Sequence, residues 1–259
     1  MNMLPMCQLI PGLVSITYRS LGAADIIRLA ADSGLQAIEW GADVHVPPGD
    51  LERARRVAKE TRTAGLAVSS YGSYYKAGSA PASFADILET ALALEAPRIR
   101  VWAGTLDADQ AEGEARRAVT DDLRRVVDLA ARQGVRVAVE FHAGTLTSTA
   151  ASARTLLQDV PELESYWQPR AGIGSGEALE DLSVLSQRVV HAHVFHWHPH
   201  WERHPLAVGA ACWPIYMKAL HDLGRPIHVQ LEYVKDDRPE QLSADAATLL
   251  GWLADLARA

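Results

Sequence analysis

Two glutamates stand at the ends of strongly apolar segments, where a carboxylate is costly unless it is paired. Glu140 follows the mainly apolar residues 135–139, and Glu232 follows the mainly apolar residues 227–231. Burying an unpaired carboxylate costs several kcal/mol, so each of these glutamates needs a cation beside it. That cation is either an arginine or lysine of the chain or a divalent metal ion that both carboxylates share. The second choice would place metal-binding chemistry at these two segment ends.

A histidine in a third apolar segment, residues 189–195, favours the metal. Alternation along a strand would put His191, His193 and Phe195 on one face, with His191 deeper in the protein. His193 is therefore the better metal ligand, and a buried structural histidine is the alternative. Six of the ten histidines fall between positions 191 and 204. Because one strand end cannot direct all six inward, we expect most of them in a solvated substrate loop.

Aromatic and ionisable residues recur at the ends of nearly all the apolar segments. A single tryptophan at such a place would simply close the core. The recurrence of such residues at nearly every segment end favours a binding or catalytic site there. Arg203, in the histidine-rich loop, is a candidate clamp for an anion or a hydroxyl group, and an exposed arginine is the alternative. The other residues of this set are Glu39, Trp40, Tyr71, Trp102, His142, His196 and Trp197.

These residues need a scaffold that gathers distant segment ends, and the chain carries such a pattern. Short apolar segments start at residues 34, 65, 96 and 134, so the starts are 31, 31 and 38 residues apart. Each interval is about the length of one strand–helix unit. Gly34, Gly65 and Gly134 open three of the segments directly after a helical pattern. Glycine there is typical of the left-handed residue that ends a helix.

Four further segments complete the strand count. Residues 9–18, 188–195 and 226–233 are predicted strands, and residues 166–173 are a weaker candidate. Eight strands, each followed by a helix, predict an α/β protein of the (β/α)₈ TIM-barrel type, as one domain over residues 1–259. A doubly wound open sheet is the rival, but no G-x-G-x-x-G follows the first strand.

The composition excludes several classes of protein. With 48% apolar residues among 259, the chain can bury a sizeable core and is not expected to be disordered. No apolar run approaches the roughly 18 residues of a membrane span, and residues 1–10 lack a signal-peptide pattern. Cys7 and Cys212 alone provide no disulfide framework. A net charge of −7 offers no field for nucleic acid, and we expect a cytoplasmic protein.

Three of the segment ends resemble a known family. Glu140 in Val-Ala-Val-Glu-Phe-His, His193 in Val-His-Ala-His-Val-Phe and Glu232 in His-Val-Gln-Leu-Glu-Tyr resemble the xylose isomerase-like TIM barrels. More closely, the chain is similar to the sugar phosphate isomerase/epimerase group that contains the ketose 3-epimerases. Gly34-Leu-Gln-Ala-Ile-Glu-Trp fits the second strand of that group. The resemblance runs from about residue 9 to residue 255.

The resemblance implies one divalent metal ion, most often Mn²⁺, with Mg²⁺, Co²⁺ and Zn²⁺ as alternatives. Glu140, His193 and Glu232 match three of the family's four ligands. Gln168 stands where the family has an aspartate, and Ala171 stands where it has a substrate-binding histidine. A glutamine oxygen can ligate Mn²⁺ or Mg²⁺ but brings no negative charge. The implied ligand set is therefore Glu140, Gln168, His193 and Glu232.

For activity, the resemblance implies a sugar isomerase or epimerase that acts on a keto-sugar or a related derivative. In such enzymes the metal stabilises the enediolate that forms when an α proton is removed, and two glutamates take and return that proton. Glu140 and Glu232 would fill those roles. An apolar floor for the sugar would come from Trp40, Tyr71, Trp102 and Trp197, and the predicted substrate-binding set is completed by Glu39, His142, His196 and Arg203.

Other functions stay open beside this one. A metal-dependent lyase or dehydratase would remove the same proton but expel a leaving group, from a keto-glycoside or a keto-inositol. A non-catalytic sugar-binding or partner subunit is kept open by Gln168 and Ala171. A nucleic-acid enzyme similar to endonuclease IV would need a basic face and a larger metal cluster. We expect a small carbohydrate as the partner, neither nucleic acid nor membrane, and leave a homodimer or larger homo-oligomer open.

Overall fold

Eight parallel strands close into a barrel in the computed structural model, which describes residues 9–79 and 83–258. Around the barrel the order is β1-β10-β7-β6-β5-β4-β3-β2. The predicted (β/α)₈ TIM-barrel fold is therefore confirmed. The barrel strands are β1 (Leu9–Val14), β2 (Ala37–Gly41), β3 (Ala67–Lys76), β4 (Arg98–Trp102), β5 (Arg136–Val139), β6 (Glu164–Trp167), β7 (Val189–Val194) and β10 (Ile227–Leu231).

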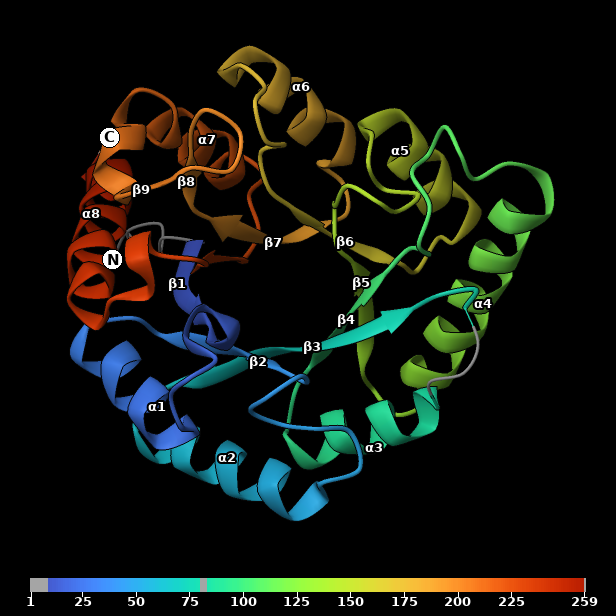
Figure 1. Cartoon of the computed structure of the whole chain (residues 1–259), viewed down its shortest axis with the longest axis horizontal. Coiled ribbons are helices and arrows are strands. Elements are labelled where there is room, and N and C mark those ends of the chain that lie inside the picture. Colours follow the sequence, from blue (N-terminus) through green and yellow to red (C-terminus); the bar gives the residue numbers. More distant parts are fainter. Residues whose placement is uncertain (1–8, 80–82, 259) are drawn as a thin grey trace, which may run out of the picture.

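Helices surround the barrel and bury one face each against the strands (Figure 1). They are α1 (Ala23–Asp32), α2 (Leu51–Thr63), α3 (Phe84–Ala93), α4 (Gly113–Ala131), α5 (Ala150–Asp159), α6 (Ser175–Leu185), α7 (Trp213–His221) and α8 (Pro239–Arg258). Short 3₁₀ turns cover Ser15–Tyr18, Leu206–Ala211 and Lys235–Asp237. None of the described helices has the length and apolar character that a membrane crossing requires.

Three glycines end helices in the manner the sequence predicts. Gly34, Gly65 and Gly134 follow α1, α2 and α4 with φ angles of +73°, +78° and +73°. Glycine adopts this left-handed conformation without the steric cost of a Cβ atom. The chain therefore turns at each of them toward β2, β3 and β5. Cys7, which the sequence analysis counted, lies outside the described residues.

Two segments differ from the expected boundaries. β6 covers Glu164–Trp167, two residues earlier than expected, and the chain from Gln168 onward is a loop at the mouth of the barrel. The histidine-rich segment, expected as a loop, contains a small antiparallel hairpin of β8 (His196–Trp197) and β9 (Arg203–His204). Figure 1 shows this hairpin beside α7, at the end of the barrel where β7 and β10 finish.

A row of stacked rings crosses three adjacent strands inside the protein. Tyr166 of β6, His191 of β7 and His228 of β10 are neighbours in the strand register. The Tyr166 and His191 rings lie 4.5 Å apart between centroids, and the His191 and His228 rings lie 4.7 Å apart. Burial lowers the pKa of His228 to about 4, and the positive charge of Arg98 adds to the shift. This row therefore consists of uncharged rings at neutral pH.

We expect His228→Phe to flatten the acid limb of the stability profile. Histidine in an unfolded chain has a pKa near 6.5, so the unfolded protein binds the extra proton first as the pH falls toward 4. The wild type should lose about 2 kcal/mol more unfolding free energy than the variant between about pH 7 and pH 4.5. Urea titrations at each pH measure this difference. Parallel profiles for the two proteins would contradict the prediction.

Candidate active site

A cavity of about 340 Å³ opens at the end of the barrel where the strands finish. The carboxyl ends of parallel strands meet at one face of such a barrel, so residues far apart in the sequence become neighbours there. The cavity is lined by residues from the ends of seven barrel strands and the loops that follow, among them Ile16, Tyr74, Arg100, Trp102, Glu140, His142, Gln168, Phe195, Trp197, Glu232 and Tyr233.

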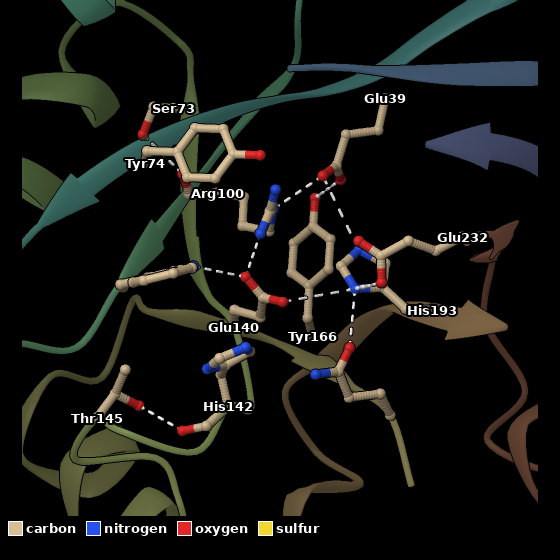
Figure 2. A network of polar contacts seen from close by, with 12 residues as sticks. Glu39, Ser73, Tyr74, Arg100, Glu140, His142, Thr145, Tyr166, His193 and Glu232 are labelled. Carbon is tan, nitrogen blue, oxygen red and sulfur yellow. Dashed lines mark hydrogen bonds and ion pairs between the residues drawn. The ribbon is translucent and has the colours of Figure 1, made fainter. Parts of the chain in front are cut away.

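Arg100 of β4 lies at the inner end of this cavity and holds two glutamates. Its side chain is 3% exposed; Nε donates to Oε1 of Glu39 at 2.8 Å, and Nη1 donates to Oε2 of Glu140 (Figure 2). Nη2 has no hydrogen-bond partner among the described residues. A Cβ atom on Gly72 of β3 would lie 2.7 Å from Nη2. Glycine at position 72 therefore makes the room that the guanidinium occupies.

Glu39 of β2 forms the floor beneath the cavity. Its carboxylate is fully buried, and Oε2 accepts hydrogen bonds from Oγ of Ser70 at 2.6 Å and from the hydroxyl of Tyr166 at 2.7 Å. Burial alone would raise the pKa of Glu39, but the charge of Arg100 and the contact with His193 outweigh it and hold the pKa well below its usual range. Glu39 is thus a fixed anion under the site and does not line the cavity.

Of the four side chains predicted as metal ligands, three lie close to a ring nitrogen of the fourth, His193. Nδ1 of His193 lies 3.0 Å from Oε1 of Gln168, 3.4 Å from Oε2 of Glu232 and 3.7 Å from Oε1 of Glu140. They come from the ends of four neighbouring strands, β5, β6, β7 and β10. Figure 2 shows Glu140 and Glu232 on different sides of the His193 ring. The structure therefore brings all four predicted residues together.

The two cavity glutamates have different electrostatic surroundings. Burial favours the protonated form of both, yet Arg100, followed by His193, lowers the pKa of Glu140. The pKa of Glu232 is raised, because burial and the negative charge of Glu140 outweigh the attraction of His193. Burial also disfavours a charged His193, but Glu232 and Glu39 more than compensate and raise its pKa. The raised pKa values of His193 and Glu232 reflect the negative charge around them, whereas Arg100 compensates the charge of Glu140.

This donor set fits a divalent cation in its chemistry and charge. Two carboxylates, an imidazole nitrogen and an amide oxygen are ligands that Mn²⁺ and Mg²⁺ accept. Three buried carboxylates face one guanidinium, which leaves two negative charges uncompensated when His193 is neutral. Within residues 9–79 and 83–258, however, no three His, Cys, Asp or Glu side chains stand in a geometry that encloses an ion. The carboxylates would have to turn toward His193 to do so.

Aromatic rings form the walls of the cavity. Trp102 stacks on His142 with ring centroids 5.0 Å apart, and its Nε1 donates to Oε2 of Glu140 at 2.6 Å. On the opposite wall Trp197 packs against Trp201 and Tyr233, with centroids 5.4 and 5.5 Å apart. Three predicted substrate-binding residues, Trp102, His142 and Trp197, therefore line the space in front of the carboxylates.

Arg203 connects the β8–β9 hairpin to the loop after β10. Its guanidinium lies 4.8 Å from the ring centroid of Tyr233 and 5.9 Å from that of Trp197, and it donates to Oδ1 of Asp237 at 2.7 Å. Cation–π contacts and an ion pair thus engage the side chain that the sequence predicted as a substrate clamp. In this arrangement Arg203 fixes one wall of the site and does not line the main cavity.

Three other predicted substrate-binding residues lie outside the main cavity. Trp40 and Tyr71 are completely buried; the Trp40 ring packs on His45, and the Tyr71 hydroxyl donates to the carbonyl oxygen of Val46. Because Glu39 and Ser70 face the barrel interior, their chain neighbours Trp40 and Tyr71 point the other way. His196 faces a second, adjacent cavity.

The sequence analysis did not identify several residues of the site. They are Arg100, Ser70 and Tyr166, which hold the glutamates. Tyr74 and Tyr233, which line the mouth, belong to the aromatic residues noted at the strand ends, but no substrate role was predicted for them. One signal was available for Arg100: it lies in the middle of β4, between Ile99 and Val101, and a cation was needed beside Glu140. The cation expected beside Glu140 is thus an arginine in the structure. The negative charge of Glu232 has no arginine or lysine paired with it among the described residues.

Comparisons with known proteins agree with this architecture. The family described as "Xylose isomerase-like TIM barrel" matches residues 27–256. The probable 3-DHS dehydratase AsbF of Bacillus anthracis, involved in petrobactin synthesis, is 19% identical with a TM-score of 0.78, over 93% of this chain and 98% of that one. D-psicose 3-epimerase, solved in the presence of D-fructose, is 16% identical with a TM-score of 0.69, over 94% and 97%.

A third structure, a xylose isomerase-like TIM barrel protein from Mycobacterium smegmatis in complex with magnesium, is 16% identical with a TM-score of 0.71, and the match covers 100% of each chain. At these identities the likeness establishes a common fold. No match was found among proteins of curated function.

Removing the charge of Arg100 should destabilise the protein strongly. Arg100→Met leaves Glu39 and Glu140 buried without their cation, and breaking a buried ion pair in this way costs about 3–5 kcal/mol. Urea unfolding at neutral pH measures the loss. Arg62→Met is the matched control, because Arg62 pairs with Glu95 on the surface, where both side chains are about 60% exposed, and should change stability by less than about 1 kcal/mol. Equal stabilities of the two variants would refute the assignment.

Proposed function

The chain belongs to the xylose isomerase-like TIM barrel family, and from that premise we propose that it is a divalent-metal-dependent isomerase or epimerase of a keto-sugar or sugar derivative. One observation carries the proposal. Glu140 and Glu232 approach Nδ1 of His193 from different strands, at 3.7 and 3.4 Å, at the inner end of an aromatic-walled cavity. Two carboxylates on either side of a bound carbon atom are the groups that a proton transfer in both directions requires.

Glu140, Gln168, His193 and Glu232 would hold the ion, for which Mn²⁺ is our first choice and Mg²⁺, Co²⁺ and Zn²⁺ are alternatives. When bound, such an ion supplies Lewis acidity that polarises the carbonyl group of the substrate. The uncompensated negative charge around His193 supports this assignment, as does the oxygen-rich character of the set.

The protein's own groups then position and move the proton. Arg100 and Trp102 bind Oε2 of Glu140, which leaves Oε1 turned toward His193. One glutamate removes the proton from the carbon next to the carbonyl, and the other returns a proton to that carbon or to its neighbour. Nη2 of Arg100 has no partner in the described part of the chain and is buried beside Gly72, behind the two glutamates that Arg100 holds. The rings of Trp102 and Trp197 provide faces against which the sugar stacks.

Elimination of water or another leaving group begins with the same proton abstraction. A lyase or dehydratase is therefore the second function that this site accommodates, and the fold is shared with a probable dehydratase as well as with an epimerase. The products differ: an epimer or isomer keeps every atom of the substrate, whereas elimination yields an unsaturated fragment. Product analysis by mass thus separates the two.

Metal affinity should depend on Glu232. We expect protein prepared without chelators to bind about one Mn²⁺ per chain in calorimetric titration, and Glu232→Ala to weaken that binding by at least about tenfold. Glu202→Ala is the control, because Glu202 is an exposed glutamate of the hairpin, and it should bind as the wild type does. A wild type that takes up no divalent ion would overturn the metal-dependent mechanism.

Proton exchange tests the paired glutamates. With Mn²⁺ and D-fructose in D₂O, the wild type should incorporate deuterium next to the carbonyl, as followed by NMR. Glu140→Gln and Glu232→Gln keep the shape of the side chain but cannot accept a proton, so each should slow exchange by about 10²–10⁴-fold. Glu162→Gln, on the surface, should exchange at the wild-type rate. Unchanged exchange in either cavity variant would show that the pair is not the acid/base machinery.

A further inference from the structure

A second cavity of about 440 Å³ adjoins the first. The two share the walls formed by Phe195, Trp197 and residues 169–171, so a molecule bound in one can extend into the other. The second cavity lies between the loop after β6, the β8–β9 hairpin and the start of α7. It contains none of the residues that hold the proton-transfer site.

Among the residues described, the second cavity has no unpaired permanent charge in its lining. Its only permanently charged lining residue is Arg170, among the residues described, and that guanidinium is bound to Asp181 at 2.7 Å and to Glu177 at 3.3 Å. The remaining lining combines aromatic rings and imidazoles, such as Trp213 and His198, with small and aliphatic residues such as Ile173 and Ala211. Such a lining offers no free cation to a phosphate or carboxylate group.

One buried donor in the shared wall lacks a partner. Nε1 of Trp197 is shielded from solvent and makes no hydrogen bond with any described residue. A buried N–H without a partner costs about 1–3 kcal/mol, and a ligand oxygen recovers that cost only after a shift of the ring that uncovers Nε1. His196, whose pKa burial lowers, is a neutral imidazole and offers both a donor and an acceptor nitrogen. Indole faces and imidazole nitrogens together suit the apolar face and the hydroxyl groups of a sugar ring.

We propose that the second cavity binds an uncharged sugar ring attached to the keto-sugar, so that the substrate is a keto-disaccharide or a related glycoside. The proposal rests on the proposed function, because it assumes that the keto-sugar lies in the first cavity. It narrows the substrate class: a free monosaccharide would leave the second cavity empty, and a sugar phosphate would find no cation there.

Gly174 offers a way to fill the second cavity alone. It lines that cavity and not the first, its backbone angles of φ −76° and ψ 161° suit any residue, and a Cβ atom there meets nothing within 4 Å. Gly174→Phe therefore adds a large side chain without backbone strain. Gly176→Phe is the matched control, because Gly176 lies two residues further on, is equally unobstructed and lines neither cavity.

Calorimetry on the Mn²⁺-loaded protein with D-fructose and with isomaltulose, a glucosyl-fructose, tests the proposal. The wild type should bind isomaltulose at least about tenfold more tightly than fructose. Gly174→Phe should remove that advantage and leave fructose binding unchanged, while Gly176→Phe should behave as the wild type. His198→Ala, which removes a polar group of the second cavity only, should weaken isomaltulose binding in the same selective way.

Two results would overturn the proposal that the second cavity binds a sugar ring. One is equal affinity of the wild type for the two sugars, and the other is equal weakening of the binding of both sugars in Gly174→Phe. The failure of the proposed function looks different. In that case the binding preference for isomaltulose persists, but neither sugar exchanges its α proton for deuterium. The two proposals are thus tested by separate readouts, binding selectivity for one and proton exchange for the other.

Discussion

The burial of three carboxylates beside one guanidinium determines how the mouth of this barrel is built. Each carboxylate taken out of water needs hydrogen bonds or a cation, and Arg100 serves two of them with its planar fork. Ser70 and Tyr166 complete the partners of Glu39. Within residues 9–79 and 83–258, Glu232 has no hydrogen-bond donor or ion-pair partner beside it other than His193. The electrostatic demand of the site is therefore concentrated between Glu140, His193 and Glu232.

Backbone geometry delivers these charges to one place. The alternation of side chains along a strand turns Glu39 inward from β2 and Arg100 inward from β4, with β3 between them. A side chain on the intervening strand at position 72 would collide with the guanidinium, and the absence of a Cβ there is what lets the two partners meet across it. The ion pair and the glycine thus depend on each other: without Gly72 the arginine has no room, and without Arg100 the buried Glu39 has no cation.

The barrel was predictable from the sequence because its signals are local. Gly34, Gly65 and Gly134 mark helix ends, and apolar runs mark the strands between them. The gathering of Glu140, His193, Glu232 and Gln168 was predictable for a related reason, since parallel strand ends meet at one face. The sequence analysis did not predict which way neighbouring side chains point. Glu39 and Trp40 are adjacent on one strand, so they cannot both face the site. The partner of Glu140 and the β8–β9 hairpin depend on tertiary contacts that no short stretch of sequence records.

The same charge balance explains why an uncharged amide, Gln168, suits this position. Glu39 and Arg100 neutralise each other, which leaves the single charges of Glu140 and Glu232 to oppose the two charges of the proposed ion. A third carboxylate at position 168 would give the loaded site a net negative charge in a space that excludes water, where an uncompensated charge is expensive. With Gln168 the loaded site is neutral. The neutral loaded site and the second cavity, which has no unpaired permanent charge among the described residues, would then both lack a net positive charge that attracts an anionic group. If both proposals hold, discrimination against charged substrates follows from the same charge balance that stabilises the site.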